Sequence, residues 1–400
     1  MSSAVFFEVS AVRYTKLFAA LVALTSYTGL AQAQDNNLAE PAANDEPIDL
    51  TSRQAPWGRS DIDVSRKDRL YSVDASSSFV AVTDPVRGRL LGFIPLDKGV
   101  GLSAVVEPTL NFAPDGRTLA INLARSSTVA FLDTRTNSVR RSVIVAGIPA
   151  GAFYTPNGKE AWIPVRGADY ISVRDAKTLD ELARVAIPEG PGLMTFSNNG
   201  RYAYVCAMTG SRMIVVDTGK RAIIDRVANS SNSCSSIASS PNGRQVWFTA
   251  KEAGQAVALS TKPPFAVLRT VDTGPRSNAV NFVSNDDGQF AYVSVGGLGV
   301  VKVVDTDTFD TVATLPVTGI PKGLWPSGDG SLMYVALGNR NAIAVIDTVK
   351  QKLINSLPVG QPAQAVAYVP YAIRSGHGLV NLQATAQGAS SSAPAAGSDR

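Results

Sequence analysis

Cysteine and histidine are scarce in this chain of 400 residues, which limits the chemistry that its side chains can perform. Two cysteines, Cys206 and Cys234, are too few for a zinc-finger array or a disulfide scaffold. His377 is the single histidine, so no site that needs several imidazoles can form. The motifs Cys-x-x-Cys-His, Gly-x-Ser-x-Gly and His-Glu-x-x-His do not occur in the sequence. We therefore assign no catalytic residue, no metal site and no cofactor.

Basic residues in predicted loops are the patterned candidate for a binding site. The set comprises Arg125, Arg166, Arg212, Lys251, Arg276, Lys322 and Arg340, with Trp325 and Phe153 just after loops of the same kind. Arg125, Arg166 and Lys251 come at the end of the second predicted strand in three different repeats. A ring of cations around a central channel would attract an anionic ligand or an acidic partner. The alternative interpretation is ordinary solvated loops.

An internal repeat must position these side chains. Its turns contain Gly116, Gly158, Gly200, Gly243, Gly288 and Gly330, which are 42, 42, 43, 45 and 42 residues apart. An Asp-Thr pair, or a relic of it, begins 17 residues after each glycine, at Asp133, Asp175, Asp217, Ser260, Asp305 and Asp347. Because the offset is the same in all six repeats, we infer one structural unit that occurs six times.

Each repeat is predicted to form four short strands. In the last complete repeat these are Pro321–Pro326, Leu332–Leu337, Ala342–Asp347 and Gln351–Pro358. Alternating apolar residues and β-branched side chains favour strands, and the Asp-Gly and Asn-Gly pairs favour tight turns. The aspartate before each threonine is expected to accept backbone N–H groups in a turn. Four strands in 40–45 residues are typical of a propeller blade, so we predict an all-β, seven-bladed propeller.

The seventh blade is predicted to combine both ends of the chain. Ala363–Val369 repeats a first strand, while Phe79–Thr83 and Arg89–Leu96 look like third and fourth strands. Its second strand is either Leu70–Asp74 or His377–Leu382, and the sequence does not decide between them. Ring closure of this kind removes exposed sheet edges.

The repeat resembles the bacterial YVTN-type β-propeller repeat. The resemblance rests on Tyr204-Val205-Cys206, Tyr292-Val293-Ser294, Tyr334-Val335-Ala336, Val303-Val304-Asp305-Thr306, Val345-Ile346-Asp347-Thr348 and Val359-Gly360-Gln361-Pro362. The asparagine of the name motif is absent here. The resemblance implies the propeller fold, and it implies no particular activity because members of that family differ widely.

The start of the chain is predicted to be an export signal. An apolar run at residues 17–31 follows Arg13 and Lys16 and precedes Ala31-Gln32-Ala33, a small-x-small cleavage pattern. The predicted organisation is a signal peptide at 1–33, a disordered linker at 34–56, a propeller at 57–383 and a disordered tail at 384–400. We expect a periplasmic or secreted protein without a membrane span after cleavage. In that oxidising compartment Cys206, in the second strand of one repeat, and Cys234, which opens the next, should form a disulfide.

We expect an exported protein that binds through its loops, without catalysis, an unknown protein or an anionic small molecule. Resemblance to lactonase-like propellers leaves an enzyme open, with Glu107, Glu189, Arg166 and Arg276 as candidates but no histidine in the repeats. Similarity to the propellers of haem and quinoprotein redox enzymes leaves a non-catalytic accessory subunit open. The formal charge of +4 gives no argument for nucleic acid, which is not expected as a partner.

Overall fold

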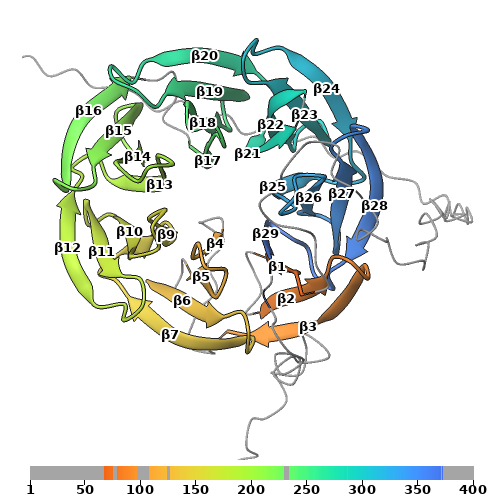
Figure 1. The fold of residues 1–400 in the computed structure, drawn as a ribbon, viewed down its shortest axis with the longest axis horizontal. Coiled ribbons are helices and arrows are strands. Elements are labelled where there is room, and N and C mark those ends of the chain that lie inside the picture. Colours follow the sequence, from red (N-terminus) through yellow and green to blue (C-terminus); the bar gives the residue numbers. More distant parts are fainter. Residues whose placement is uncertain are drawn as a thin grey trace, which may run out of the picture. The chain divides into compact units, whose positions relative to one another are not determined.

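Seven antiparallel sheets surround a central axis, as Figure 1 shows, and confirm the predicted all-β propeller. The computed structural model describes residues 67–74, 79–96, 108–123, 127–228, 234–285, 287–370 and residue 372. All of these residues belong to one compact unit, Ala43–Arg400. Within the described part of the chain, no helix is long and apolar enough to cross a membrane.

The strands follow one another from the axis outward in each blade. Blade 1 contains β4 (Leu110–Phe112), β5 (Thr118–Leu123), β6 (Thr128–Asp133) and β7 (Ser138–Ile144). Blade 2 contains β8 (Ile148–Pro149), β9 (Phe153–Tyr154), β10 (Glu160–Arg166), β11 (Tyr170–Asp175) and β12 (Glu181–Ala186). Blade 3 contains β13 (Pro191–Phe196), β14 (Tyr202–Ala207), β15 (Arg212–Asp217) and β16 (Ala222–Ala228). Blade 4 contains β17 (Ser236–Ser239), β18 (Gln245–Ala250), β19 (Gln255–Ser260) and β20 (Val267–Asp272).

The last three blades complete the ring. Blade 5 contains β21 (Ser277–Asn285), β22 (Gly288–Val295), β23 (Val300–Asp305) and β24 (Thr311–Pro316). Blade 6 contains β25 (Pro321–Pro326), β26 (Leu332–Leu337), β27 (Ala342–Asp347) and β28 (Lys352–Pro358). Blade 7 contains β29 (Ala365–Val369), β1 (Arg69–Val73), β2 (Phe79–Asp84) and β3 (Arg89–Pro95). Thus β1 supplies the second strand of the closing blade, which decides for the N-terminal alternative.

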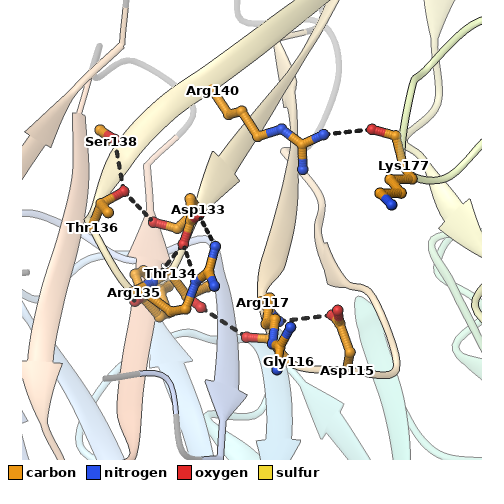
Figure 2. Close-up of polar contacts among 11 residues, drawn as sticks. Asp115, Gly116, Arg117, Asp133, Thr134, Arg135, Thr136, Ser138, Arg140 and Lys177 are labelled. Atoms are coloured by element: carbon orange, nitrogen blue, oxygen red, sulfur yellow. Dashed lines mark hydrogen bonds and ion pairs between the residues drawn. The ribbon is translucent and has the colours of Figure 1, made fainter. Parts of the chain in front are cut away.

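The repeated threonine explains the constant offset in the sequence. Thr134 donates its hydroxyl to the carbonyl oxygen of Gly116 at 2.8 Å, as Figure 2 shows. The same bond joins Thr218 to Gly200 at 2.6 Å and Thr348 to Gly330 at 2.7 Å, always over 18 residues. Each bond ties the turn between third and fourth strands to the turn between first and second strands.

The repeated aspartate caps its own turn, as predicted. The Asp305 carboxylate accepts backbone N–H groups of Asp307 and Thr308, each at 2.8 Å. Asp347 accepts the backbone N–H groups of Val349 and Lys350 in the same way. These bonds satisfy turn donors that would otherwise depend on water.

Buried hydrophobic side chains form one cluster between each pair of neighbouring blades in the described residues. An aromatic residue of the second strand lies in each of several such clusters, and its polar atom reaches the next blade. Tyr204 donates its hydroxyl to the carbonyl of Thr261 at 3.0 Å, and Tyr71 donates to that of Thr134 at 3.3 Å. The repeat motif therefore couples adjacent blades as well as building each one.

Among the described residues, no further strand pairs with the outer edge of any blade. In every blade the pairing of the third and fourth strands shifts register at a bulge. Bulges twist an outer strand and make it a poor template for pairing with another chain.

Replacing Thr348 by valine should lower the stability of the protein, whereas the same change at Thr306 should not. Thr348 and Thr306 are both buried at equivalent positions, but the Thr306 hydroxyl has no hydrogen-bond partner. Loss of the bond to Gly330 should cost about 1–2 kcal/mol, while removal of an unsatisfied buried hydroxyl should be neutral or stabilising. Thermal denaturation of the two variants measures the difference, and equal melting temperatures would contradict this role for the hydroxyl.

Candidate functional site

The propeller has two different faces because neighbouring strands are antiparallel. The turn face carries the connections between first and second strands and between third and fourth strands. The loop face carries the connections between second and third strands and between one blade and the next. The predicted cations belong to the loop face.

The predicted cations within the described residues lie at the loop-face ends of strands in blades 2 to 6, with two of them in blade 6. Arg166 ends β10, Lys251 follows β18, and Arg276 immediately precedes β21. Arg212 opens β15 and, like Arg340, is exposed. Arg125, Glu107 and His377 lie outside the described residues, as do the predicted signal, linker and tail.

Lys322 and Arg340 flank the same loop of blade 6. The stem of Lys322 lies over Gly338, where a Cβ atom would come within 2.9 Å of Lys322 Cγ. Arg340 packs against Gly319 in the neighbouring loop, at 3.2 Å from the place of a Cβ atom. Each of these two cationic side chains thus packs against a glycine of the loop that faces it.

Acidic residues share the face with these cations. Asp169 and Glu252 are exposed in loops between second and third strands, and Glu189 is half-buried in the loop before β13. The described part of the loop face therefore has mixed charge. Among the described residues, no group of three or more histidine, cysteine, aspartate or glutamate side chains could hold a metal ion.

The two aromatic residues that the sequence places just after loops lie in inner strands. The Trp325 ring in β25 is 5.4 Å from that of Phe112 in β4, so it spans the inner strand of blade 7. Phe153 in β9 packs against the cluster between blades 2 and 3. Both side chains fill the core between blades, and they are only partly exposed.

Backbone hydrogen bonds join the loops of the loop face in pairs. The N–H of Met208 donates to the carbonyl of Gly190 at 2.9 Å, and that of Gly296 donates to the carbonyl of Arg276 at 2.8 Å. In blade 6 the N–H of Gly338 donates to Ile320 at 2.9 Å. In blades 3, 5 and 6 the loop after the second strand is thus held against the loop that enters the same blade, and its side chains are presented from fixed backbone.

Large hydrophobic side chains are exposed on these tied loops. Met208 is 44% exposed and Leu298 is 53% exposed, while Ile144 and Ile148 add two exposed isoleucines at the same face. Leu298 packs against Gly274, where a Cβ atom would lie 2.9 Å from Leu298 Cδ1. The sequence offers no signal for this exposure, since a hydrophobic residue after a strand reads equally well as core.

Cys206 and Cys234 form the predicted disulfide, with their Cα atoms 6.2 Å apart. It joins the second strand of blade 3 to the start of blade 4. Equivalent residues make hydrogen bonds between later blades: Thr249 donates to the carbonyl of Asn278 at 3.2 Å, and Ser294 donates to that of Lys322 at 2.6 Å. The disulfide therefore replaces, in one blade pair, a link that the repeat makes elsewhere by hydroxyl groups.

Glu189 is occupied by an ion pair. Arg226 of the outer strand β16 donates to Glu189 Oε1 at 2.5 Å. This hydrogen bond lowers the pKa of Glu189 below its ordinary value, and Arg226 and Arg212 add favourable charge. A carboxylate held ionised by arginine is a poor general acid. Glu189 and Arg276 also lie in loops that enter different blades, so the residues considered for catalysis are dispersed over the face.

Comparisons with known proteins agree with this architecture. Solved structures with the same fold include hydrazine synthase of Kuenenia stuttgartiensis, at 18% identity and a TM-score of 0.57, covering 69% of this chain and 96% of that one. They also include the dihydro-heme d1 dehydrogenase NirN in complex with DHE, at 13% identity and 0.58, covering 82% and 80%. A functionally unknown protein from Desulfotomaculum acetoxidans DSM 771 matches at 13% identity and 0.62, covering 76% and 99%. At these identities the likeness concerns the fold alone.

Sequence comparison identifies the family. The uncharacterized protein YncE of Salmonella typhi is 26% identical over 141 residues, which are 35% of this chain. The chain spans about two fifths of the length of this curated relative. The family model for YNCE-like β-propellers matches residues 104–374, which include all of blades 1 to 6 and the inner strand of blade 7. The chain therefore belongs to the YNCE-like β-propeller family.

Proposed function

We propose that this protein is an exported, non-catalytic binding protein that recruits a protein partner through its loop face. The observation that carries the proposal is the presentation of Met208 and Leu298 on hydrogen-bonded loops. Arg212 follows Met208 closely in sequence, and Arg276 lies in the loop that is hydrogen-bonded to the loop of Leu298. Apolar side chains with cations around them suit a partner that combines apolar and acidic surface. Because backbone hydrogen bonds already hold these loops in place, little conformational entropy is lost when a partner binds.

Export is part of the proposal. The predicted signal at 1–33 and the disulfide between Cys206 and Cys234 both favour an oxidising compartment, periplasmic or extracellular. Assignment of the repeat to the bacterial YVTN type is also part of the proposal. That type shares the Tyr-Val and Asp-Thr elements, which here link neighbouring blades and join the turns within a blade.

The other two functions considered have less support. A lactonase-like activity would need a free acid or base, and Glu189 is held in an ion pair with Arg226. A role as an accessory subunit of a redox system rests on the fold of hydrazine synthase and NirN, at 18% and 13% identity. Co-purification with a cytochrome would favour that role over the binding function proposed here.

Replacing both Met208 and Leu298 by serine should reduce the recovery of a cross-linked partner at least about tenfold, because two apolar side chains of this kind contribute about 1.5–3 kcal/mol each when buried. Partners are captured from periplasmic extract with wild type and variant and quantified by mass spectrometry. The matched control replaces Leu182 and Val312, which are equally exposed on outer strands, by serine. Equal recovery with both double variants would refute the loop face as the binding surface.

A further inference from the structure

The turn face carries a row of cations that the sequence repeat places in register. The residue directly after the turn glycine is Arg117 in blade 1, Lys159 in blade 2, Arg201 in blade 3 and Arg244 in blade 4. All four side chains are exposed. We call these four residues the cationic arc. Since the turn joins the innermost strand to the second strand, the arc follows the inner part of four consecutive blades around the central axis (Figure 1).

The backbone at each arc residue is held by the same hydrogen bond. The N–H of Arg117 donates to Asp115 Oδ1 at 2.9 Å, as Figure 2 shows, and that of Arg244 donates to Asn242 Oδ1 at 2.9 Å. Lys159 and Arg201 donate in the same way to the asparagine two residues earlier, each at 3.0 Å. The four side chains therefore leave from equivalent, fixed positions.

The arc cations differ from their neighbours in forming no ion pair within the described residues. Arg135, in the outer turn of blade 1, pairs with Asp133 at 2.7 Å, and Arg221 pairs with Glu160 at 2.8 Å. Arg201 instead lies over the ring of Tyr202, at 5.1 Å from its centroid, which leaves the charge uncompensated. The arc thus presents four exposed positive charges that no carboxylate of the described residues neutralises by an ion pair.

The rest of the turn face interrupts the arc. Gln289 and Ser331 occupy the same position in blades 5 and 6, and both are buried. The turns of blade 5 are acidic, with exposed Asp287, Asp307 and Asp310 beside the half-buried Asp305. A flat anionic surface laid on this face would meet these carboxylates and be repelled, whereas a narrow chain can follow blades 1 to 4 alone.

We propose that the cationic arc binds an extended acidic segment of a partner protein, independently of the loop face. Four separated, solvated cations give little affinity for a single small anion, because each exposed charge pair is weak and screened by salt. A peptide with several aspartate or glutamate residues engages several cations at once and gains from their proximity. The fixed turn backbone keeps the cations spaced by the blade repeat, which an extended chain can match.

The test measures binding of a fluorescein-labelled oligoglutamate peptide by anisotropy at low ionic strength, where the Debye length is about 30 Å. The arc variant carries Arg117→Ala, Lys159→Ala, Arg201→Ala and Arg244→Ala, changes that keep every backbone N–H group. The control variant carries Lys177→Ala, Lys220→Ala, Lys262→Ala and Lys352→Ala, which removes four exposed charges near the outer strands. We expect the arc variant to bind about tenfold more weakly than wild type and the control variant to stay within about twofold.

Three results would overturn the proposal. Absence of peptide binding by the wild type would show that the cationic arc is not a binding surface for acidic segments. Equal weakening by the two variants would show that only net charge matters. Binding of the wild type to phosphatidylglycerol vesicles, lost in the arc variant while the peptide is not bound, would assign the arc to a membrane instead. Melting temperatures of both variants confirm that each remains folded. Because Met208 and Leu298 are unchanged in both, failure here leaves the loop-face function standing.

Discussion

A chain that begins at residue 75, and so lacks β1, should not fold cooperatively when it is exported behind a heterologous signal. β1 pairs with β29 on one side and with β2 on the other, so its loss leaves blade 7 in two unconnected parts. Leu70, Tyr71 and Val73 are at most 3% exposed and pack into the clusters on both sides of the blade. Loss of one buried side chain of this size costs about 2–5 kcal/mol of stability. The summed cost of losing all three approaches the whole free energy of unfolding of a typical domain.

Circular dichroism during thermal denaturation measures this outcome, with resistance to a protease as a second readout. The matched control begins at residue 67 and retains β1 together with Asp68, which accepts a hydrogen bond from the hydroxyl of Tyr368 in β29. We expect a single sharp transition for the control and none for the shorter chain. A sharp transition of the shorter chain at the temperature of the control would show that the ring closes without β1.

Replacement of both Cys206 and Cys234 by alanine should lower the free energy of unfolding by about 3–4 kcal/mol. The disulfide closes a loop of 28 residues, and the estimate comes from the entropy that this closure removes from the unfolded chain. Blades 3 and 4 would keep their shared hydrophobic cluster, so the fold should survive with a lower melting temperature. Thermal denaturation with and without reductant measures the effect.

Reductant should lower the melting temperature of the wild type and leave that of the double alanine variant unchanged. The variants Thr249→Ala and Ser294→Ala serve as comparators, because these residues make the equivalent contact by a hydrogen bond. Each should cost about 1 kcal/mol, the usual net contribution of such a bond. A disulfide effect no larger than that of Ser294→Ala would mean that the covalent link adds nothing beyond the ordinary contact between blades.

Fold and turn chemistry could be predicted because they depend on residues close together in sequence. The constant offset from Gly330 to Asp347 arises because these residues belong to two turns of the same blade, one between the first and second strands and one between the third and fourth. The hydrogen bond from Thr348 to Gly330 holds the two turns together. The continuous apolar run of Leu332–Leu337 is that of a short strand buried on both faces. This local pattern, repeated six times, defines the blade. Each blade has two apolar faces that must be covered by neighbouring blades, which favours closure into a ring.

Both the disulfide and the composite blade were predictable for a related reason. Cys206 and Cys234 fall at defined places of neighbouring repeats, so the repeat itself brings them together. The choice between two candidates for the second strand of blade 7 was not predictable, since either end of the chain carries a suitable segment. Pairing of Leu70 with Tyr368, about 300 residues away in the chain, decides it.

By itself, the sequence determined the architecture: seven four-stranded blades, closure by both ends of the chain, and one covalent link between blades. Only the tertiary structure decided which side chains remain free for a partner. It turned Trp325 toward the core, exposed Met208 and Leu298, and engaged Glu189 with Arg226. It also left Arg117, Lys159, Arg201 and Arg244 without ion pairs to the other described residues. The physical reason is range, because strand and turn preferences act over a few residues, whereas exposure and charge pairing depend on neighbours brought from other blades.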